Sequence, residues 1–491
     1  MIESWIPDTP SFGCNGPQSG ARQRLSARKA RASLLKLHSV FSISLTMDAP
    51  IMMKQYDTAP KAALPHDLPP TELSVPGPDS VTVAKKRSQW SCIDDNRLRN
   101  NLFAAVGFLE LANAGDFAAN VWNDVPVPIY AIVFMAIGGT SAFVLSICAF
   151  FDSRKAWRNI KFLRQQKQYL ETEKENLPAV ADSRGLDVFI EITTRELRIE
   201  IINRWAMDLL MGGGAMLISI GTYMAIGGAN RKVWHASNIL SGYLGNAPIA
   251  LFGLLSAIWA SMVVSKMRSH VKIAKKELQG SPSLPLLKQR CFSVQLFFIL
   301  NGIANVLGGV GSMITAERWW GYCILIPVIV TSIFCNVWWR HRVGYDRPCI
   351  SAIPSLTVDN VTEALESTSQ LRHTIQDGAG VDLDQIFGEE VTLQDVLKLF
   401  VKHDLFEQFS VRLVANKKIG HLFVKAQELR VQVSVASVLD LPEEHYPLIL
   451  AAALRFLKKQ GPRHLLHRER FLIEVLGTYL NQEKKSQAVE V

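Results

Sequence analysis

Polar side chains that fall inside apolar stretches are the residues of this chain best placed to do chemistry. Asn301, Asn305 and Ser312 recur at helical spacing and so share one stripe of a predicted helix, and Asn246 precedes Pro248 near the start of another. In a membrane, such groups either hydrogen-bond neighbouring helices together or line a polar path for a solute. The pattern favours helix packing and leaves the path as the alternative.

Signatures of catalysis and metal binding are absent from the sequence. It contains no H-E-x-x-H, G-x-S-x-G, Walker or Rossmann pattern, so we predict a non-enzymatic protein without a cofactor. His464-Leu-Leu-His467 lies among arginines and has no acidic or cysteine partner, which indicates a solvated basic face and no metal site. None of the seven cysteines forms a C-x-x-C pair, which argues against a disulfide framework and a zinc site.

Five apolar stretches would position the polar side chains. Each offers about 20 residues without a charge in its middle, enough to cross ~30 Å of hydrocarbon as a helix. The predicted spans are 129–151, 205–227, 243–265, 291–314 and 319–339. The expected fold class is an all-α membrane protein, a bundle of five or six transmembrane helices with a cytosolic C-terminal helical domain.

Lysine and arginine alternate between abundant and scarce in the loops, and this alternation orients the spans. Residues 113–128 carry two aspartates and no basic residue, whereas 152–204 and 266–290 are strongly basic. Because short cytosolic loops collect basic residues, we predict that 113–128 lies outside and that both basic loops and the C-terminal region lie inside. The inside loops also explain most of the net charge of +9, so nucleic acid is not an expected partner.

The loop after the first span begins with basic residues on a predicted helix. Trp157, Ile160 and Leu163 share its apolar face. A basic amphipathic helix can bind anionic lipid headgroups, but such cations can equally serve only to stop translocation. The candidate membrane-surface residues are Arg154, Lys155, Arg158, Lys161, Arg164 and Lys167.

Charged residues also precede the second span. Glu191 and Arg195, and Glu200 and Arg204, stand at i, i+4 spacing and are expected to pair. Asp208 lies one turn inside the span, close to Arg204, and is expected to form a cap or an ion pair at the membrane interface.

The N-terminal 95 residues are predicted to be a disordered tail. Proline and glycine recur through 50–78, and no periodic apolar face appears. Residues 21–46 are basic and acid-free, as in a mitochondrial transit peptide, but a disordered basic tail or an extension upstream of Met47 is favoured. The sequence favours a plasma membrane or endomembrane over a mitochondrial one.

The segment 96–121 is ambiguous. Apolar residues recur at helical spacing from Leu98 to Leu109, but Glu110 and Asp116 make a full crossing costly. We predict an amphipathic helix at the membrane surface or a re-entrant helix. In the alternative, the segment is a sixth span and the N-terminus lies inside.

Residues 350–491 are predicted to form a soluble helical domain. Thr392-Leu-Gln-Asp395 resembles a capping box, and helices are expected over 393–401, 422–441, 447–460 and 464–482, with a break at Gly461-Pro462. The glycosylation sequon at Asn360 would lie inside and remain bare.

Three segments resemble a group of uncharacterised fungal multi-pass integral membrane proteins. They are DVPVPIYAIVFMAIGG at 124–139, MGGGAMLISIGTYMAIGG at 211–228 and ASNILSGYLGNAP at 236–248. The resemblance covers roughly 96–345 and supports the topology. It implies no activity.

A second resemblance lies in the C-terminal region. TLQDVLKLFVKHDLFEQF at 392–409 and HLFVKAQELR at 421–430 resemble the regulator-of-G-protein-signalling (RGS) domain. Members of that family bind Gα and stabilise its GTPase transition state, partly through the asparagine of an E-N-x-x-F motif. With Phe423 as the aromatic residue of that motif, Ile419 and Gly420 replace the Glu and Asn. The resemblance therefore implies a catalytically silent version, and a plain helical bundle is the alternative.

Together, these features predict a membrane-tethered scaffold or signalling adaptor that acts through its cytosolic domain. Its partners would be the lipid bilayer, anionic headgroups and a cytosolic protein bound at 350–491, Gα if the RGS-like interpretation holds. The alternatives are an RGS-like G-protein regulator and a transporter or channel with an Asn-lined path.

Overall fold

The computed structural model describes residues 79–86, 89–92, 97–100, 102–122, 127–178, 182–350, 356–377, 387, 391–416, 418–424 and 429–489. All of them belong to one compact unit, 71–491. The disorder predicted for residues 1–78, including the basic segment 21–46, lies outside the described residues.

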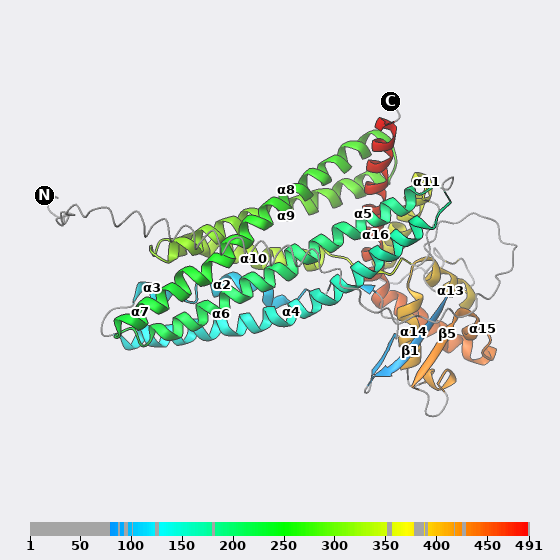
Figure 1. Ribbon diagram of the computed structural model, residues 1–491. Helices are drawn as coiled ribbons and strands as arrows, with labels where there is room; N and C mark the ends of the chain where they lie inside the picture. The colour runs from blue at the N-terminus through cyan, green and yellow to red at the C-terminus, as the bar shows by residue number, and fades with distance from the viewer. Residues whose placement is uncertain are drawn as a thin grey trace. The chain divides into compact units, whose positions relative to one another are not determined.

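Among the described residues, five helical stretches are long and apolar enough to cross a membrane (Figure 1), which confirms the predicted all-α class and the five predicted spans. Two are single helices, two consist of α-helices joined by a π-helical turn, and one is a helix that ends in such a turn. They are α4 (Ile129–Glu175), α5–η2–α6 (Arg184–Ile199, Glu200–Ala206, Met207–Ala225), α7–η3–α8 (Arg231–Asn238, Ile239–Gly245, Asn246–Glu277), α9 (Ser283–Thr315) and α10–η4 (Gly321–Trp338, Trp339–Val343).

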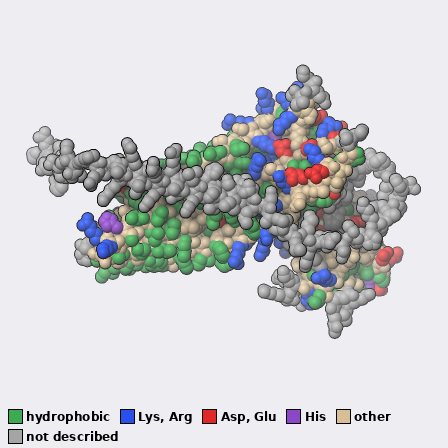
Figure 2. Space-filling view, viewed as in Figure 1, with side chains coloured by type: hydrophobic (Ala, Val, Ile, Leu, Met, Phe, Trp, Pro, Cys, Tyr) green, Lys and Arg blue, Asp and Glu red, His purple; other side chains and the backbone are tan. Residues whose placement is uncertain are grey.

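The surface of this bundle is apolar. Large side chains such as Ile129, Phe134 and Phe150 are exposed, and Figure 2 shows hydrophobic side chains along the helices. An exposed apolar surface of this extent is costly in water, because each buried Å² of such surface would gain about 25 cal/mol. The surface therefore suits a lipid environment.

Glycines bring the helices of the bundle into backbone contact. A Cβ added at Gly214 of α6 would lie 2.5 Å from the carbonyl oxygen of Gly245, and one at Gly253 of α8 would lie 2.4 Å from that of Asn305 in α9. No side chain larger than hydrogen fits at these distances. The glycine run of the second span therefore has a packing role.

The segment 102–122 runs along the bundle with one face buried against it, while Phe103, Phe108 and Leu111 on its other face are exposed. It forms η1 (Ala104–Phe108), α2 (Leu109–Ala112) and α3 (Phe117–Val121), which pack against α4, α6 and α10. The Phe103 N–H donates to Asp152 Oδ1 at 3.2 Å, and the ring of Trp122 lies 5.5 Å from that of Tyr130. We call the end of the bundle that adjoins the C-terminal part the domain end and the opposite end the far end. The segment thus runs along the bundle from the domain end, near Asp152, to the far end, near the start of α4.

This arrangement differs from the single amphipathic or re-entrant helix predicted for 96–121. The segment forms several short helices in place of one long helix, because its backbone packs directly against that of α4. A Cβ at Gly138 would lie 2.0 Å from the Gly115 carbonyl oxygen. Inside the bundle, partners for the polar groups come from distant helices, which local sequence does not reveal.

The C-terminal part is mainly helical, as predicted. Its helices are α11 (Val358–Asp377), α13 (Leu393–Lys402), α14 (Phe406–Ala415), η5 (Gly420–Leu422), α15 (Val435–Leu439), η6 (Glu443–His445) and α16 (Tyr446–Val489). Thr392 caps α13 by accepting the Asp395 N–H at 3.2 Å, as the capping-box pattern predicts. The predicted break at Gly461-Pro462 is wrong, since α16 continues through Pro462.

A small antiparallel sheet joins residues that precede the bundle to residues of the C-terminal part. Its strand order is β2 (Gln89–Cys92), β1 (Ser80–Lys86), β5 (Arg430–Ser434), with Val83 opposite both Cys92 and Val431. Residues 80–92 are therefore strands and not part of a disordered tail, and β5 interrupts the helix predicted at 422–441. An isolated strand or hairpin is only marginally stable in water. β1 is therefore stabilised by β5, which lies about 350 residues away in sequence.

The N-terminal strands are also fixed by charge. Two-residue strands β3 (Arg97–Leu98) and β4 (Arg347–Pro348) pair, and Arg97 forms ion pairs with Asp404 at 2.9 Å and with Glu407 at 2.7 Å. The residues before the bundle and those after it thus lie at the same end.

Candidate functional site

The second half of α16 leaves the C-terminal core and packs against α5, α8 and α9 at the domain end (Figure 1). Leu472, Leu476 and Leu480 of α16 are buried in one cluster with Met267 of α8 and Val294 of α9. The predicted boundary between the bundle and a separate domain 350–491 therefore does not divide the core, since one helix belongs to both.

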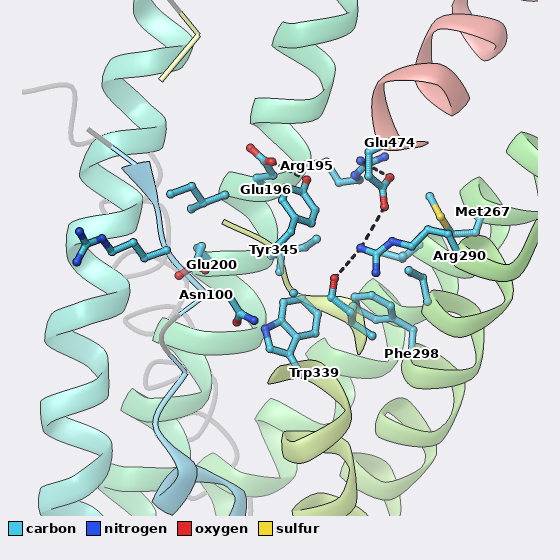
Figure 3. A pocket seen from close by; sticks show the side chains of 17 residues that line it. Asn100, Arg195, Glu196, Glu200, Met267, Arg290, Phe298, Trp339, Tyr345 and Glu474 are labelled. Atoms are coloured by element: carbon cyan, nitrogen blue, oxygen red, sulfur yellow. Dashed lines mark hydrogen bonds and ion pairs between the residues drawn. The ribbon is translucent and has the colours of Figure 1, made fainter. Parts of the chain in front are cut away.

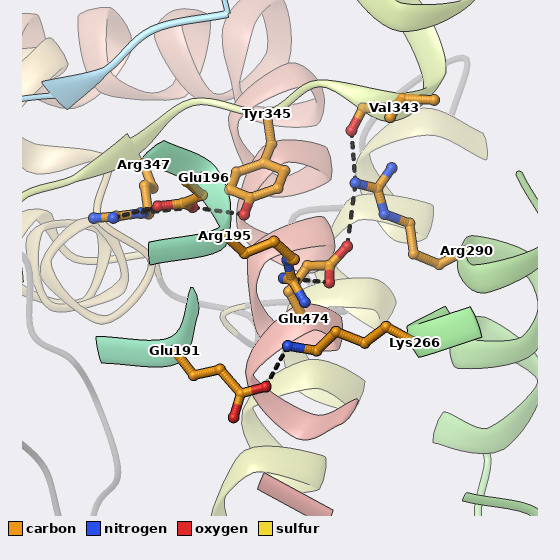
Figure 4. A network of polar contacts seen from close by, with 9 residues as sticks. All are labelled: Glu191, Arg195, Glu196, Lys266, Arg290, Val343, Tyr345, Arg347 and Glu474. Carbon is orange, nitrogen blue, oxygen red and sulfur yellow. Dashed lines mark hydrogen bonds and ion pairs between the residues drawn. The ribbon is translucent and has the colours of Figure 1, made fainter. Parts of the chain in front are cut away.

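A buried carboxylate, Glu474, holds this junction together (Figure 4). It accepts a hydrogen bond from Arg195 of α5 at 2.7 Å and lies 3.6 Å from a guanidinium nitrogen of Arg290 in α9. Arg290 also donates to the Val343 carbonyl oxygen at 2.6 Å. Burial raises the pKa of Glu474, but the two arginines outweigh burial, and the pKa is lowered overall. The carboxylate is thus held ionised.

A second ion pair lies beside the first. The Arg347 guanidinium donates through Nε to both Glu196 oxygens at 3.0 Å, and the Tyr345 hydroxyl donates to Glu196 at 2.6 Å. These contacts fix residues 345–347, which follow η4, against α5, so four separate parts of the chain meet at two carboxylates.

The pairing predicted between Glu191 and Arg195 is not formed. Arg195 pairs with Glu474, and Glu191 pairs with Lys266 of α8. An i, i+4 pair on a helix surface contributes only about 0.2–0.5 kcal/mol, so buried tertiary partners outweigh it.

A cavity of about 60 Å³, measured as room for the centres of water-sized molecules, opens beside these ion pairs (Figure 3). One water needs roughly 10–15 Å³ on that scale, so several waters or a small polar group would fit. Its wall combines the rings of Phe298, Trp339 and Tyr345 with Arg195 and Glu474. Its lining holds three arginines and three glutamates, so positive and negative side chains are balanced. The cavity therefore shows no preference for a cation over an anion.

His270 of α8 lies behind Glu474. It is buried against α16, where a Cβ added at Gly477 would lie 2.7 Å from His270 Nδ1. Burial, together with the positive charge of Arg195, lowers the pKa of His270 to about 3. The ring is therefore neutral and acts as a packing surface at the junction.

A third buried ion pair lies deeper, where α4 and α6 enter the bundle. Arg204 donates to both oxygens of Asp152 at 3.0 Å and pairs with Glu200 at 3.3 Å, so the predicted pair of Glu200 and Arg204 is confirmed. Asp208 interacts with Arg204 through charge, as expected, but neither Asp208 oxygen has a hydrogen-bond partner in the part of the chain that the structure describes.

The polar residues predicted for the bundle interior mostly join helices. The Asn246 amide donates to the Ser312 carbonyl oxygen at 2.7 Å, and the Asn305 amide donates to the Ser256 hydroxyl at 2.7 Å, so both residues bridge α8 and α9. Asn246 and Ser312 are fully buried, and Asn301 is half-buried on α9. These contacts are those of helix packing.

The basic residues predicted to lie at a membrane surface form one region of α4. Arg154 lies over the Phe150 ring at 4.6 Å, and Arg164 lies over the Trp157 ring at 5.6 Å. The predicted apolar face is buried at Ile160 and Leu163. Exposed members are Arg154, Arg158, Lys161 and Arg164, and half-buried members are Lys155 and Lys167.

The pair His464 and His467 was predicted to lie on a solvated face, and this is wrong for His467. It is buried, and its Nδ1 accepts the Asp346 N–H at 2.6 Å. Burial lowers the pKa of His467 to about 4. Residues just after the bundle cover this face of α16, which no local pattern indicates.

The residues of the junction were missed by sequence reasoning, although one signal was present. Glu474 is the single charge in FLIEVLGTYL, residues 471–480. A lone acid on an otherwise apolar helix must find a buried partner, and Arg290, at the start of a predicted span, was a candidate.

Comparisons with known proteins identify no relative. No family model matches the chain, and neither a curated protein nor a solved structure is significantly similar to it.

Proposed function

We propose that the protein is a multi-pass membrane protein that acts as a non-enzymatic, membrane-tethered scaffold or signalling adaptor through residues 350–491. The Glu474 junction carries this proposal. Because α16 is shared by the bundle and the C-terminal core, a partner bound to that core is held rigidly at the membrane, and a change in helix packing reaches it directly.

The proposed topology has six crossings, with both ends on the cytosolic side. The segment 102–122 runs the length of the bundle, and β1 pairs with β5, so the residues before and after the bundle share one end. The basic residues of α4 and of 266–290 gather at that end, as expected for the cytosolic face. Protease added outside intact cells should leave residues 340–491 uncut, and cleavage there would contradict this topology.

The adaptor role can be tested by proximity labelling in cells. A biotin ligase fused after Val491 should label a set of cytosolic proteins at least tenfold above the same ligase on an unrelated single-span anchor. The variant Asn301→Leu should leave this set unchanged, because the bundle would only tether the domain. Equal labelling by the unrelated anchor would contradict an adaptor function.

The RGS-like alternative is less well supported by the geometry. Ile419 and Gly420 are buried, and a Cβ at Gly420 would lie 2.2 Å from the Val414 carbonyl oxygen. An asparagine side chain at this position could not reach a partner. We therefore expect the purified protein not to accelerate GTP hydrolysis by any Gα, and acceleration would restore this alternative.

A transporter with an Asn-lined path is also less well supported, because the amides of Asn246 and Asn305 are engaged between α8 and α9. Asn305→Leu should lower the yield of folded protein and should abolish no solute flux.

A further inference from the structure

We propose that the bundle conducts protons along three buried carboxyl groups, those of Asp208, Glu110 and Asp116. They follow one another from the domain end to the far end. Two of them lie on the segment 102–122, outside the five apolar stretches, so an inspection of those stretches alone finds no ionisable group at mid-depth. An ionisable side chain inside a bundle of membrane-crossing helices is costly and points to a function.

Glu110 occupies the middle position. It is 1% exposed and accepts a hydrogen bond from the neutral amide of Asn113 at 2.6 Å. Its carboxylate faces α9, where a Cβ added at Gly308 would lie 3.1 Å from both oxygens. Gly308 precedes the last residue of α9, Thr315, by seven positions, so Glu110 lies roughly 10 Å inside the far end.

Asp116 lies closer to the far end. It is fully buried and accepts a hydrogen bond from the Tyr322 hydroxyl at 2.9 Å, and that hydroxyl accepts from the Asn120 amide at 2.8 Å. Tyr322 belongs to the first turn of α10, so this chain of polar groups reaches the end of the helix. The second Asp116 oxygen, Oδ2, has no partner among the described residues.

Asp208 lies at the domain end, on the buried side of α6. It is 3% exposed, and both oxygens lack a hydrogen-bond partner within the described ranges. Asp152, Glu200 and Arg204 surround it electrostatically, so three carboxylates face one guanidinium. One guanidinium cannot balance three carboxylates, and a bound proton on Asp208 neutralises the excess negative charge.

The order of the three groups follows from the path of the segment. Phe103 lies beside Asp152, and Gly115 lies against Gly138, so residues 103–115 run along α4 from the domain end toward the far end. The groups are separated by more than a hydrogen bond, and bridging water would have to connect them. Asp116 Oδ2 and Ser312 Oγ are buried and have no hydrogen-bond partner among the described residues, so they would be binding positions for such water.

Each transfer is a simple proton exchange. A protonated carboxyl gives its proton to the next carboxylate or through water, becomes a carboxylate, and takes up another proton from the opposite side. Only O–H bonds break and form, and nothing is oxidised or reduced.

Proton uptake into vesicles tests the proposal. The purified protein in liposomes, with a pH-sensitive dye inside and a potassium-diffusion potential across the membrane, should acidify the lumen at least tenfold faster than protein-free liposomes. Glu110→Gln should reduce the rate to that of protein-free liposomes, and the exposed control Asp182→Asn should leave it unchanged. A wild-type rate equal to protein-free liposomes, or full flux in folded Glu110→Gln, would overturn the proposal.

Folding of each variant is read from its melting temperature in detergent. If Glu110→Gln does not fold, Asp208→Asn replaces it, because its carboxyl group makes no hydrogen bond that the amide would lose. Folded Asp208→Asn should also lose flux, and retained flux overturns the proposal.

A measurement on the wild type needs no variant. A hydrophobic carbodiimide, which adds to protonated carboxyl groups to give an N-acylurea, should block the flux, with the adduct mapped by mass spectrometry to Glu110, Asp116 or Asp208. Unblocked flux, or blocking with adducts only elsewhere, overturns the route through these residues.

Discussion

The far part of the bundle and its domain end are held together by different interactions. In the far part, helices meet through glycines and neutral amides, as at Gly253 with Asn305. At the domain end, α5, α9 and α16 meet through Glu474 and its two arginines. One region depends on shape, and the other depends on charge.

This difference indicates where the molecule can respond to its surroundings. Close contacts between glycines do not change with pH or salt, whereas buried charges and neutral histidines respond to protons. The junction, and not the glycine contacts, is therefore the part through which conditions at the membrane surface can reach the C-terminal domain.

The largest effect is expected from removing the charge at the junction. Glu474→Ala leaves Arg195 and Arg290 buried without their carboxylate, which should lower the free energy of unfolding by about 3–5 kcal/mol. Denaturant unfolding of the purified protein measures it. Glu444→Ala, an exposed acid in the same domain, should change stability by less than about 0.5 kcal/mol. Equal effects would remove the contrast between the two regions.

The glycine contacts can be tested with two neighbouring residues. Gly214→Ala places a methyl group 2.5 Å from the Gly245 carbonyl oxygen, whereas Gly213→Ala meets nothing within 4 Å. We expect Gly214→Ala to destabilise by about 1–3 kcal/mol through overpacking, and Gly213→Ala to be neutral or stabilising. Thermal melting compares them. A destabilised Gly213→Ala would show that the helix itself, and not the contact, requires glycine.

The same comparison explains what the sequence could predict. Span length, loop charge and the glycine run are local features, and they predict the five long helices and their close packing. The N-cap at Thr392 is also local, and its side chain accepts the Asp395 N–H as predicted. Such signals lie within a few residues of the element that they specify.

What the sequence could not predict depends on distant pairs. β1 pairs with β5, Glu474 pairs with Arg195 and Arg290, and one face of the segment 102–122 is buried because it packs against α4 and α10. The chain contains many strands and charged residues that could pair with one another, and charge alone does not determine which pairs form. The residues proposed to carry protons were thus visible in the sequence, but their depth was not.

The pH response of the junction should show the role of buried histidine. The pKa of His270 is about 3 in the folded protein, whereas an unfolded histidine titrates near 6.5. Between these values the unfolded chain binds more protons, so stability falls as pH falls. From pH 7 to pH 5, one such histidine should cost roughly 2 kcal/mol.

Melting temperatures at pH 7 and pH 5 measure this loss. His270→Gln should reduce it, and the exposed control His421→Gln should not. The pKa of Glu474 is lowered, so its contribution is lost only at still lower pH and does not enter this window. An unchanged loss in His270→Gln would assign the response to other groups.

The smallest effect is expected at the basic surface of α4. Arg154, Arg158 and Lys161 are exposed at the domain end, where each cation near an anionic leaflet contributes about 1 kcal/mol. Changing any one of them to glutamine should lower the anionic lipid retained by the purified protein about fivefold, as measured by mass spectrometry. Arg231→Gln, on the far side of the bundle, should retain the wild-type amount. Equal losses from the two ends would mean that anionic lipid does not distinguish them, and that the α4 cations serve only to set the direction of insertion.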